Sequence, residues 1–265
     1  MGALHAGHIS LIDISKNFRP TANVRPSAGP PPASVTVCSI FVNPTQFNDP
    51  KDYQKYPITI EKDIALLEAA GVDALFLPEV SEMYPDGTTG LEKYDLGHLE
   101  TILEGKYRPG HFQGVCQVMR RLLQLVRPDD LFMGSKDYQQ CMVVQRLIQL
   151  MDWSIHLHRC PIVREPDGLA MSSRNARLNP EERQRATAIY KALTTFQYVD
   201  SGTGAPDTER AIAIAQKSLE KAQFRVDYIA VCDPETLEPT NASRGAVALI
   251  AAFQGEVRLI DNLVL

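Results

Sequence analysis

The run M-G-A-L-H-A-G-H places two histidines, His5 and His8, around Gly7 and directly before a segment of helical character. The free N–H groups and the positive dipole end of a helix N-terminus attract phosphate, and a glycine lets the backbone come close to it. Two imidazoles there can donate hydrogen bonds to an α-phosphate while charge builds during nucleophilic attack. The run indicates phosphate chemistry. The alternative is a pair of surface histidines, because short motifs often match by chance.

A second run, G-L-A-M-S-S-R-N (residues 168–175), is polar and cationic and stands between an expected strand and an expected helix. Its two hydroxyls and the guanidinium of Arg174 can hold phosphate oxygens, the guanidinium in bidentate geometry. The alternative is a solvated loop whose serines cap the turn.

A third run, G-S-K-D (residues 134–137), stands at the carboxyl end of an expected strand, where ligands bind in open α/β sheets. Lys136 is thereby placed to meet a phosphate, and Asp137 to meet a ribose or an amine. The alternative is an Asp137 helix cap beside an exposed lysine.

Two further runs carry amide and basic side chains. Gln46, in N-P-T-Q-F, follows another expected strand, and its amide suits a hydroxylated, carboxylate-bearing substrate because it both donates and accepts. Arg108 and His111 stand in L-E-G-K-Y-R-P-G-H-F. The alternatives are a turn residue for Gln46 and a Pro-Gly loop with solvated charges for Arg108 and His111.

An alternation of strands and helices positions these runs. Apolar segments typical of buried parallel strands alternate with segments of helical length, which predicts crossover units and a parallel sheet. We expect strands at residues 35–42, 74–77, 131–133 and 155–158 and helices at residues 9–18, 59–70, 113–126 and 138–150. Five prolines between residues 19 and 34 exclude a helix there and predict an exposed insertion.

The pattern changes after residue 161. The expected elements are helices at residues 180–196 and 207–222 and strands at residues 226–232, 246–252 and 257–260. The turn at Gln254-Gly255 predicts an antiparallel hairpin. The predicted fold class is therefore α/β, with a Rossmann-like parallel-sheet domain over residues 1–161 and a smaller α+β domain over residues 162–265.

Composition excludes several classes of protein. The chain has 265 residues, of which 44% are hydrophobic, as in a globular protein with a core. A net charge of -5 argues against nucleic acid as a partner. The five cysteines show no pairing or ligand spacing and are expected to be reduced and mostly buried. Without an apolar run of about 18 residues or a signal-peptide profile, we expect no membrane partner and a cytoplasmic protein.

Together the runs resemble the pantothenate synthetase (pantoate-beta-alanine ligase) family, within the H-x-G-H nucleotidyltransferase superfamily related in fold to class I aminoacyl-tRNA synthetases. The matching segments, in the family's order, are M-G-A-L-H-A-G-H, S-I-F-V-N-P-T-Q-F, L-E-G-K-Y-R-P-G-H-F-Q-G-V, G-S-K-D-Y-Q-Q and D-G-L-A-M-S-S-R-N. Independent matches across almost the whole chain are far more specific than any one of them. The resemblance implies ATP, Mg²⁺, pantoate and beta-alanine as ligands, a pantoyl-adenylate intermediate and a homodimer.

The resemblance also implies roles for individual residues. His5, His8 and Lys136 would be catalytic, and Gln46 and Gln140 would hold pantoate. The ATP-binding residues would be Met1, Gly2, His5, Gly7, His8, Gly134, Ser135, Lys136, Asp137, Val163, Met171, Ser172, Ser173 and Arg174. Magnesium would be held chiefly by the ATP phosphates, with its protein ligands unassigned. Asp63 is expected to be a surface carboxylate of its helix rather than a residue near that ion.

The chain departs from the family at its start. In the family a strand and a turn precede the first motif, whereas Met1 is already the methionine of that motif. We therefore expect the first strand to be missing and Met1 to be an internal residue of a longer functional protein, with about 25 residues upstream. The competing interpretations are another H-x-G-H nucleotidyltransferase, which would form a dinucleotide or a CDP-linked product, and a family member without turnover.

Overall fold

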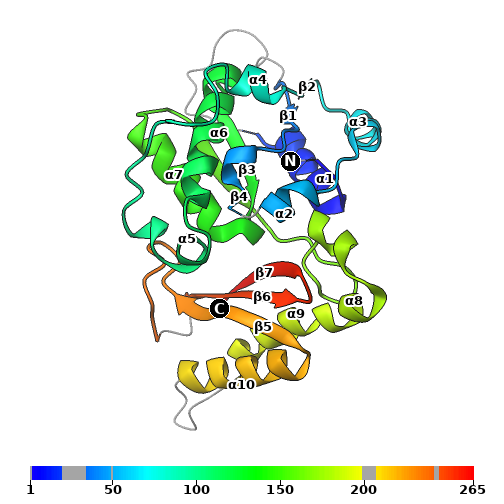
Figure 1. Ribbon diagram of the computed structural model, residues 1–265, viewed down its shortest axis with the longest axis vertical. Coiled ribbons are helices and arrows are strands. Elements are labelled where there is room, and N and C mark those ends of the chain that lie inside the picture. The colour runs from blue at the N-terminus through cyan, green and yellow to red at the C-terminus, as the bar shows by residue number, and fades with distance from the viewer. Residues whose placement is uncertain (1, 20–33, 49, 199–206, 242–244) are drawn as a thin grey trace.

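The computed structural model describes residues 2–19, 34–48, 50–198, 207–241 and 245–265. The expectations for Met1 and for residues 20–33 of the Pro-rich stretch therefore lie outside the described residues. Figure 1 shows the short parallel strands in the upper half of the molecule and an antiparallel sheet in the lower half.

The upper half contains two pairs of parallel strands. Strand β1 (Val37–Ser39) pairs with β2 (Ala74–Phe76), and β3 (Asp130–Gly134) pairs with β4 (His156–Cys160). Within the described residues these pairs are separate two-stranded sheets. The helices between and beside them are α1 (Ala6–Asn17), α3 (Ile60–Ala69), α6 (His111–Val126) and α7 (Tyr138–Leu150). The predicted alternation of strands and helices is confirmed, although β1 is shorter than the expected residues 35–42.

Helix α6 shows how local sequence sets the packing near the later site. The helix begins after Gly110, whose φ of 80° lies in the left-handed region. One face is apolar, and its buried residues include Phe112, Val115, Cys116, Val118 and Leu123. Gly114 lies against a 3-10 turn, and a Cβ added to it would sit 2.7 Å from the Cα of Gln46. Because Gly114 has no side chain, α6 can contact this turn directly and set the position of Gln46.

The lower half is an antiparallel sheet with helices packed against it (Figure 1). Its strands are β5 (Phe224–Cys232), β6 (Val247–Gln254) and β7 (Val257–Val264), in the order β5-β6-β7. Its helices are α8 (Pro180–Ala186), α9 (Ala188–Thr194) and α10 (Thr208–Lys221). The predicted hairpin is confirmed, since Gln254 pairs with Val257 across the turn. Leu193 and Leu219 pack with Ile250 in the core of this half.

The prediction of a single helix over residues 180–196 is wrong, because two shorter helices cover this segment. Helix α8 ends at Ala186 and α9 begins at Ala188. The hydroxyl of Thr187 donates to the carbonyl of Gln184 at 3.1 Å, and such side-chain bonds to the preceding turn bend helices. The sequence also did not predict the short elements, which are α2 (Pro50–Gln54), α4 (Val80–Met83), α5 (Leu103–Tyr107), η1 (Pro44–Gln46), η2 (Gly97–Glu100), η3 (Ser135–Asp137), η4 (Ser173–Arg177) and η5 (Thr195–Gln197).

The cysteines and the helices agree with the composition. The cysteines are free, and those that are buried are Cys116, Cys141, Cys160 and Cys232. In the part of the chain that the structure describes, no helix is long and apolar enough to cross a membrane.

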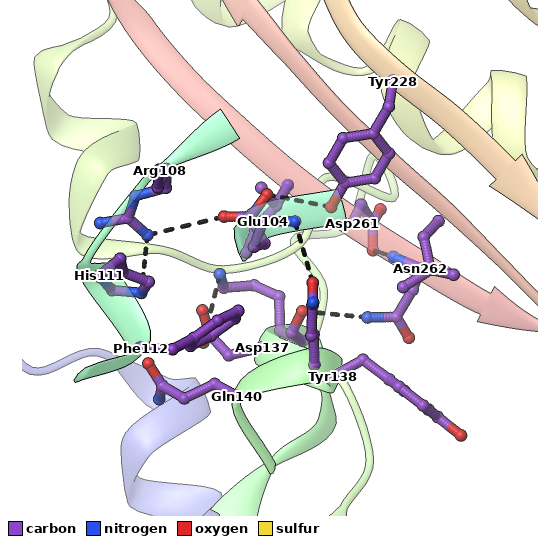
Figure 2. A pocket seen from close by; sticks show the side chains of 14 residues that line it. Glu104, Arg108, His111, Phe112, Asp137, Tyr138, Gln140, Tyr228, Asp261 and Asn262 are labelled. Carbon is purple, nitrogen blue, oxygen red and sulfur yellow. Dashed lines mark hydrogen bonds and ion pairs between the residues drawn. The ribbon is translucent and has the colours of Figure 1, made fainter. Parts of the chain in front are cut away.

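Glu104 is the centre of an ion-pair network between the two halves. Both terminal nitrogens of Arg258, in β7, donate to the Glu104 carboxylate at 2.7 and 2.8 Å, and its Nε donates to Asp227 at 2.8 Å. The hydroxyl of Tyr228 donates to Glu104 at 3.0 Å (Figure 2). Burial alone would raise the pKa of Glu104, but the hydrogen bonds and charge of Arg258 outweigh it and lower the pKa to about 2. Glu104 is therefore ionised at neutral pH and joins α5 to the antiparallel sheet.

We expect Glu104→Ala to lower the free energy of unfolding by about 3 to 5 kcal/mol, because it leaves a buried guanidinium without its main partner. Urea denaturation at neutral pH measures this loss. The control is Glu256→Ala, which breaks the exposed Lys55–Glu256 pair and should cost less than about 1 kcal/mol. Equal losses in the two variants would contradict the assignment.

The same network predicts a pH dependence. The pKa of Glu104 is lower in the folded chain than its ordinary value of 4.5, so the stabilisation is complete above pH 4.5 and is lost as the pH falls towards 2. Glu104→Ala should therefore unfold with less dependence on pH than the parent chain over this interval.

Candidate active site

One cavity collects most of the residues that the sequence singles out. It has a volume of about 330 Å³ and lies at the carboxyl ends of β1, β3 and β4, where Ser39, Gly134 and Pro161 line it. The predicted site residues that line it are His5, Gly7, His8, Gln46, Gly134, Lys136, Asp137, Gln140, Val163, Met171, Ser172, Ser173 and Arg174. Gly2 and Ser135 do not line it, and Met1 lies outside the described residues.

The two histidines cap the first turn of α1. The Nδ1 atom of His5 accepts a hydrogen bond from the backbone N–H of Gly7 at 3.2 Å, and the backbone N–H of His5 donates to Nδ1 of His8 at 3.2 Å. The centroids of the two rings are 4.0 Å apart. Because each Nδ1 accepts, a neutral ring carries its proton on Nε2. That proton is the one each histidine can donate to a ligand.

Both imidazoles are neutral at physiological pH. Burial lowers the pKa of His5 to about 4, and the charge of Lys136 adds to the shift. Burial, followed by the influence of His5, lowers the pKa of His8 to about 3. The positive charge in the cavity therefore comes from lysine and arginine side chains, while the histidines supply neutral hydrogen-bond donors.

A buried carboxylate fixes the chain ahead of the histidines. Asp63, in α3, has an exposed fraction of 0% and accepts from the backbone N–H groups of Ala3 and Leu4 at 2.8 Å each. The hydroxyl of Thr59 donates to it at 3.0 Å. The expectation that Asp63 is a surface carboxylate is therefore wrong. Its partners come from about 60 positions earlier in the chain, so the periodicity of its own helix does not reveal them.

The loop after β3 presents Lys136 to the cavity. Asn262, in β7, donates to the backbone carbonyls of Ser135 and Lys136 at 2.8 and 3.0 Å, so the antiparallel sheet holds this loop. The hydroxyl of Ser135 donates to the carbonyl of Cys160 at 2.7 Å, which directs it away from the cavity. Asp137 makes no side-chain bond that caps α7, and its carboxylate lies 3.5 Å from Nζ of Lys136. Asp137 is thus the N-cap residue of α7 by position, as in the alternative, but its side chain does not cap the helix and the side chain of Lys136 is only 19% exposed.

Residues 171–174 form a second phosphate-binding candidate, called the Ser-Ser-Arg loop below. Ser172 Oγ accepts from the backbone N–H of Arg174 at 3.2 Å and caps η4, as in the turn-capping alternative. The hydroxyl of Ser173 donates to the carbonyl of Ala3 at 3.1 Å, which joins this loop to the segment before the histidines. Both serines also line the cavity. Arg174 donates to Asp52, in α2, at 2.8 Å.

Gln46 is held by its neighbours in the structure. Asn43, almost fully buried, donates to Oε1 of Gln46 at 3.2 Å and to the carbonyl of Gly114 at 3.1 Å. The Nδ1 atom of His111 lies 2.7 Å from the carbonyl of Gln46. Its Nε2 lies 3.0 Å from a terminal nitrogen of Arg108 (Figure 2). Burial and the charge of Arg108 lower the pKa of His111 to about 3. Arg108 and His111 are therefore partners within the fold, and the alternative of solvated loop charges is wrong.

Sequence analysis gave Asp63 the wrong role and assigned no role to three other residues that organise the site, which are Asn43, Asp52 and Asn262. Asn43 opens the N-P-T-Q-F run and could have been found as the residue that ends a strand before a proline. Asp52, Asp63 and Asn262 act on segments 60 to 127 positions away, and no local pattern marks such pairs.

The described residues offer no multi-ligand metal site. Among them, no group of three or more histidine, cysteine, aspartate or glutamate side chains is placed to hold a metal ion. Both oxygens of Asp63 already accept hydrogen bonds from the chain itself.

Comparison with known proteins decides the family. The family model described as pantoate-beta-alanine ligase matches residues 1–264. The chain belongs to the pantoate-beta-alanine ligase family. A pantoate-beta-alanine ligase from Schizosaccharomyces pombe is 40% identical over 265 residues, which cover 99% of this chain and 88% of that protein.

Solved structures of pantoate-beta-alanine ligases agree with this assignment. The pantothenate synthetase from Thermus thermophilus superposes with a TM-score of 0.88 at 42% identity, covering 99% of this chain and 90% of that one. The Francisella tularensis ligase, solved with beta-gamma ATP and beta-alanine, gives a TM-score of 0.77 at 35% identity, covering 100% of this chain and 87% of that one. The resemblance and the fold class inferred from the sequence are confirmed.

We expect the imidazoles of His5 and His8 in this pantoate-beta-alanine ligase homologue to stay neutral from about pH 5.5 to 8, because burial lowers the pKa of each well below the ordinary value of 6.5. Histidine resonances followed by NMR across this interval should show no titration for these two rings. His5→Gln and His8→Gln variants assign the resonances. A midpoint near 6.5 for either ring would refute the burial argument.

Proposed function

We propose that the protein condenses pantoate with beta-alanine to give pantothenate, using ATP and passing through pantoyl-adenylate, with release of AMP and pyrophosphate. The observation that carries this proposal is that one cavity is lined by the two histidines, Lys136, the Ser-Ser-Arg loop, Gln46 and Gln140. Family membership supports it. So does the similarity to a ligase solved with beta-gamma ATP and beta-alanine.

The cationic part of the cavity suits the ATP phosphates. Lys136 and Arg174 supply positive charge, and the start of α1 supplies the positive end of the helix dipole. The Nε2 protons of His5 and His8 would donate to the α-phosphate as negative charge builds on its oxygens. Such preorganised donors act most strongly on the transition state.

The amide side chains suit the hydroxy acid. Gln46 and Gln140 line the same cavity, and each amide can donate to a carboxylate and accept from a hydroxyl. We place pantoate against these two residues, so that its carboxylate faces the α-phosphate of ATP.

The chemistry then needs alignment more than a protein nucleophile. A carboxylate oxygen of pantoate attacks the α-phosphorus, the bond to the bridging oxygen breaks, and pyrophosphate leaves. The amine of beta-alanine next attacks the carbonyl carbon of the mixed anhydride, AMP leaves, and the new amide nitrogen loses a proton. No cysteine of the described residues lines the cavity. Burial also raises the pKa of Cys116 and Cys141 to about 12, which keeps them protonated.

Magnesium would arrive with ATP. The described residues hold no cluster of metal-ligating side chains, and Mg²⁺ usually keeps several waters and few protein ligands. When bound, the ion would supply charge neutralisation at the phosphates. Lys136 and Arg174 would orient the phosphate oxygens that the ion leaves accessible.

Two expectations from the sequence stay proposals. A homodimer rests on the family resemblance. A cytoplasmic location is the expectation from the sequence pattern, and the free cysteines agree with it, because a reducing compartment keeps thiols unpaired.

Product analysis tests the proposed reaction. AMP release should require ATP, pantoate and beta-alanine together, with pantothenate formed in equal amount. A dinucleotide or a CDP-linked product would instead support another H-x-G-H nucleotidyltransferase. No AMP from a folded preparation that binds ATP would support a family member without turnover.

We expect Lys136→Ala to impair the reaction of ATP and Gln46→Ala to impair the binding of pantoate. Lys136→Ala should slow adenylate formation by a hundredfold or more, about 3 to 4 kcal/mol, because it removes a charged donor from the transition state. Gln46→Ala should weaken pantoate binding by about 1 to 3 kcal/mol and leave ATP affinity nearly unchanged. Pyrophosphate release and calorimetry with each substrate measure the two effects. Wild-type pyrophosphate release from Lys136→Ala would overturn the role of Lys136. An equal loss of affinity for pantoate and for ATP in Gln46→Ala would overturn the role of Gln46.

A further inference from the structure

We propose that Asp52 and Arg177 are positioning residues that set Arg174 for the phosphates of ATP. Asp52 fixes the place of the Arg174 guanidinium, and Arg177 supplies the second positive charge that keeps Asp52 from neutralising Arg174. This inference rests on the proposed function and extends it to two residues outside the cavity.

The three side chains form a single cluster. Terminal nitrogens of Arg174 and Arg177 donate to separate oxygens of the Asp52 carboxylate, at 2.8 and 2.6 Å. Asp52 lies in α2, more than 120 positions before the two arginines, so the cluster ties η4 to a distant short helix. All three side chains are largely buried, with exposed fractions between 18% and 27%. Such partly desolvated, charge-assisted contacts are stronger than exposed ion pairs.

Only one member of the cluster can reach a ligand in the cavity. Arg174 lines the cavity, whereas Asp52 and Arg177 do not. Asp52 occupies one terminal nitrogen of Arg174, and a guanidinium has five N–H donors, so donors remain for a phosphate. The ring of Tyr56, also in the cavity wall, lies 5.8 Å from the guanidinium and limits its movement.

The charges explain why two arginines meet one carboxylate. Burial alone would raise the pKa of Asp52, but hydrogen bonds and charge from Arg174 and Arg177 outweigh it and lower the pKa, so the carboxylate is ionised at neutral pH. One negative and two positive charges leave a net positive charge beside the cavity. Without Arg177, the Asp52 charge would be balanced by Arg174 alone. The pair would then present no net charge to an incoming phosphate.

Arg177→Ala tests the inference through ATP affinity. Calorimetry with ATP, in the absence of pantoate, should show binding weakened by about tenfold, because Asp52 would then neutralise Arg174 at the phosphate site. The affinity for pantoate should not change. Arg177→Lys keeps the charge and should keep most of the ATP affinity. Arg177→Gln removes the charge with less loss of packing and replaces the alanine variant if that variant fails to fold. Arg183→Ala is the matched control, since it removes a charge from a pair with Asp167 outside the cavity.

A double-mutant cycle separates this role from a structural one. With Asp52→Asn in place there is no carboxylate charge to offset, so adding Arg177→Ala should change ATP affinity by less than about threefold. If the two losses instead add, or if pantoate binding falls as much as ATP binding, the inference is wrong.

The outcome is distinguishable from failure of the proposed function. If the parent chain binds ATP but releases no AMP with pantoate and beta-alanine, the proposed function fails while the affinity cycle still decides the roles of Asp52 and Arg177. If the parent chain releases AMP and Arg177→Ala binds ATP as the parent does, this inference alone fails.

Discussion

The hydrogen bonds that Asp63 accepts from the backbone are the contacts on which the rest of the site depends. A buried carboxylate is costly unless donors satisfy it, and here the donors are the N–H groups of Ala3 and Leu4. These hydrogen bonds fix the segment that leads into α1, and therefore the positions from which His5 and His8 face the cavity. The carbonyl of Ala3 in turn accepts from Ser173, so the Ser-Ser-Arg loop takes its place from the same segment.

The two halves of the molecule meet through both apolar and polar contacts. Residues of α6, α7 and β6 share one apolar core, which brings the halves together without specifying their positions closely. Directional bonds specify those positions. Arg258 bonds to Glu104, and Asn262 bonds to the backbone of the Lys136 loop. The cavity is thus lined by the Lys136 loop, which bonds to β7, and by the Ser-Ser-Arg loop, which bonds to the segment before α1.

The sequence could predict the fold class and the longer helices because each has a local signal. About half of the residues that line the cavity could be predicted, some from local runs and others only from the family resemblance. Helix α7 occupies the expected residues 138–150 because its apolar spacing is regular. The short runs that contain glycine, histidine, lysine and serine likewise mark loops at the ends of strands and helices. Asp63 and Asn262 could not be assigned this way, because their partners are brought near only by the fold. Short helices such as α2 span too few turns to show a period.

Gly114 has a consequence for how firmly the turn that carries Gln46 is supported. Behind Gln46 stands the backbone of α6 rather than a side chain, because a Cβ at Gly114 would lie 2.7 Å from the Cα of Gln46. Side chains can change rotamer to make room, whereas a helix backbone in a close-packed interior yields very little. The backbone of Gln46 is therefore held against a stiff support, and a side chain at position 114 would force the 3-10 turn and the helix apart.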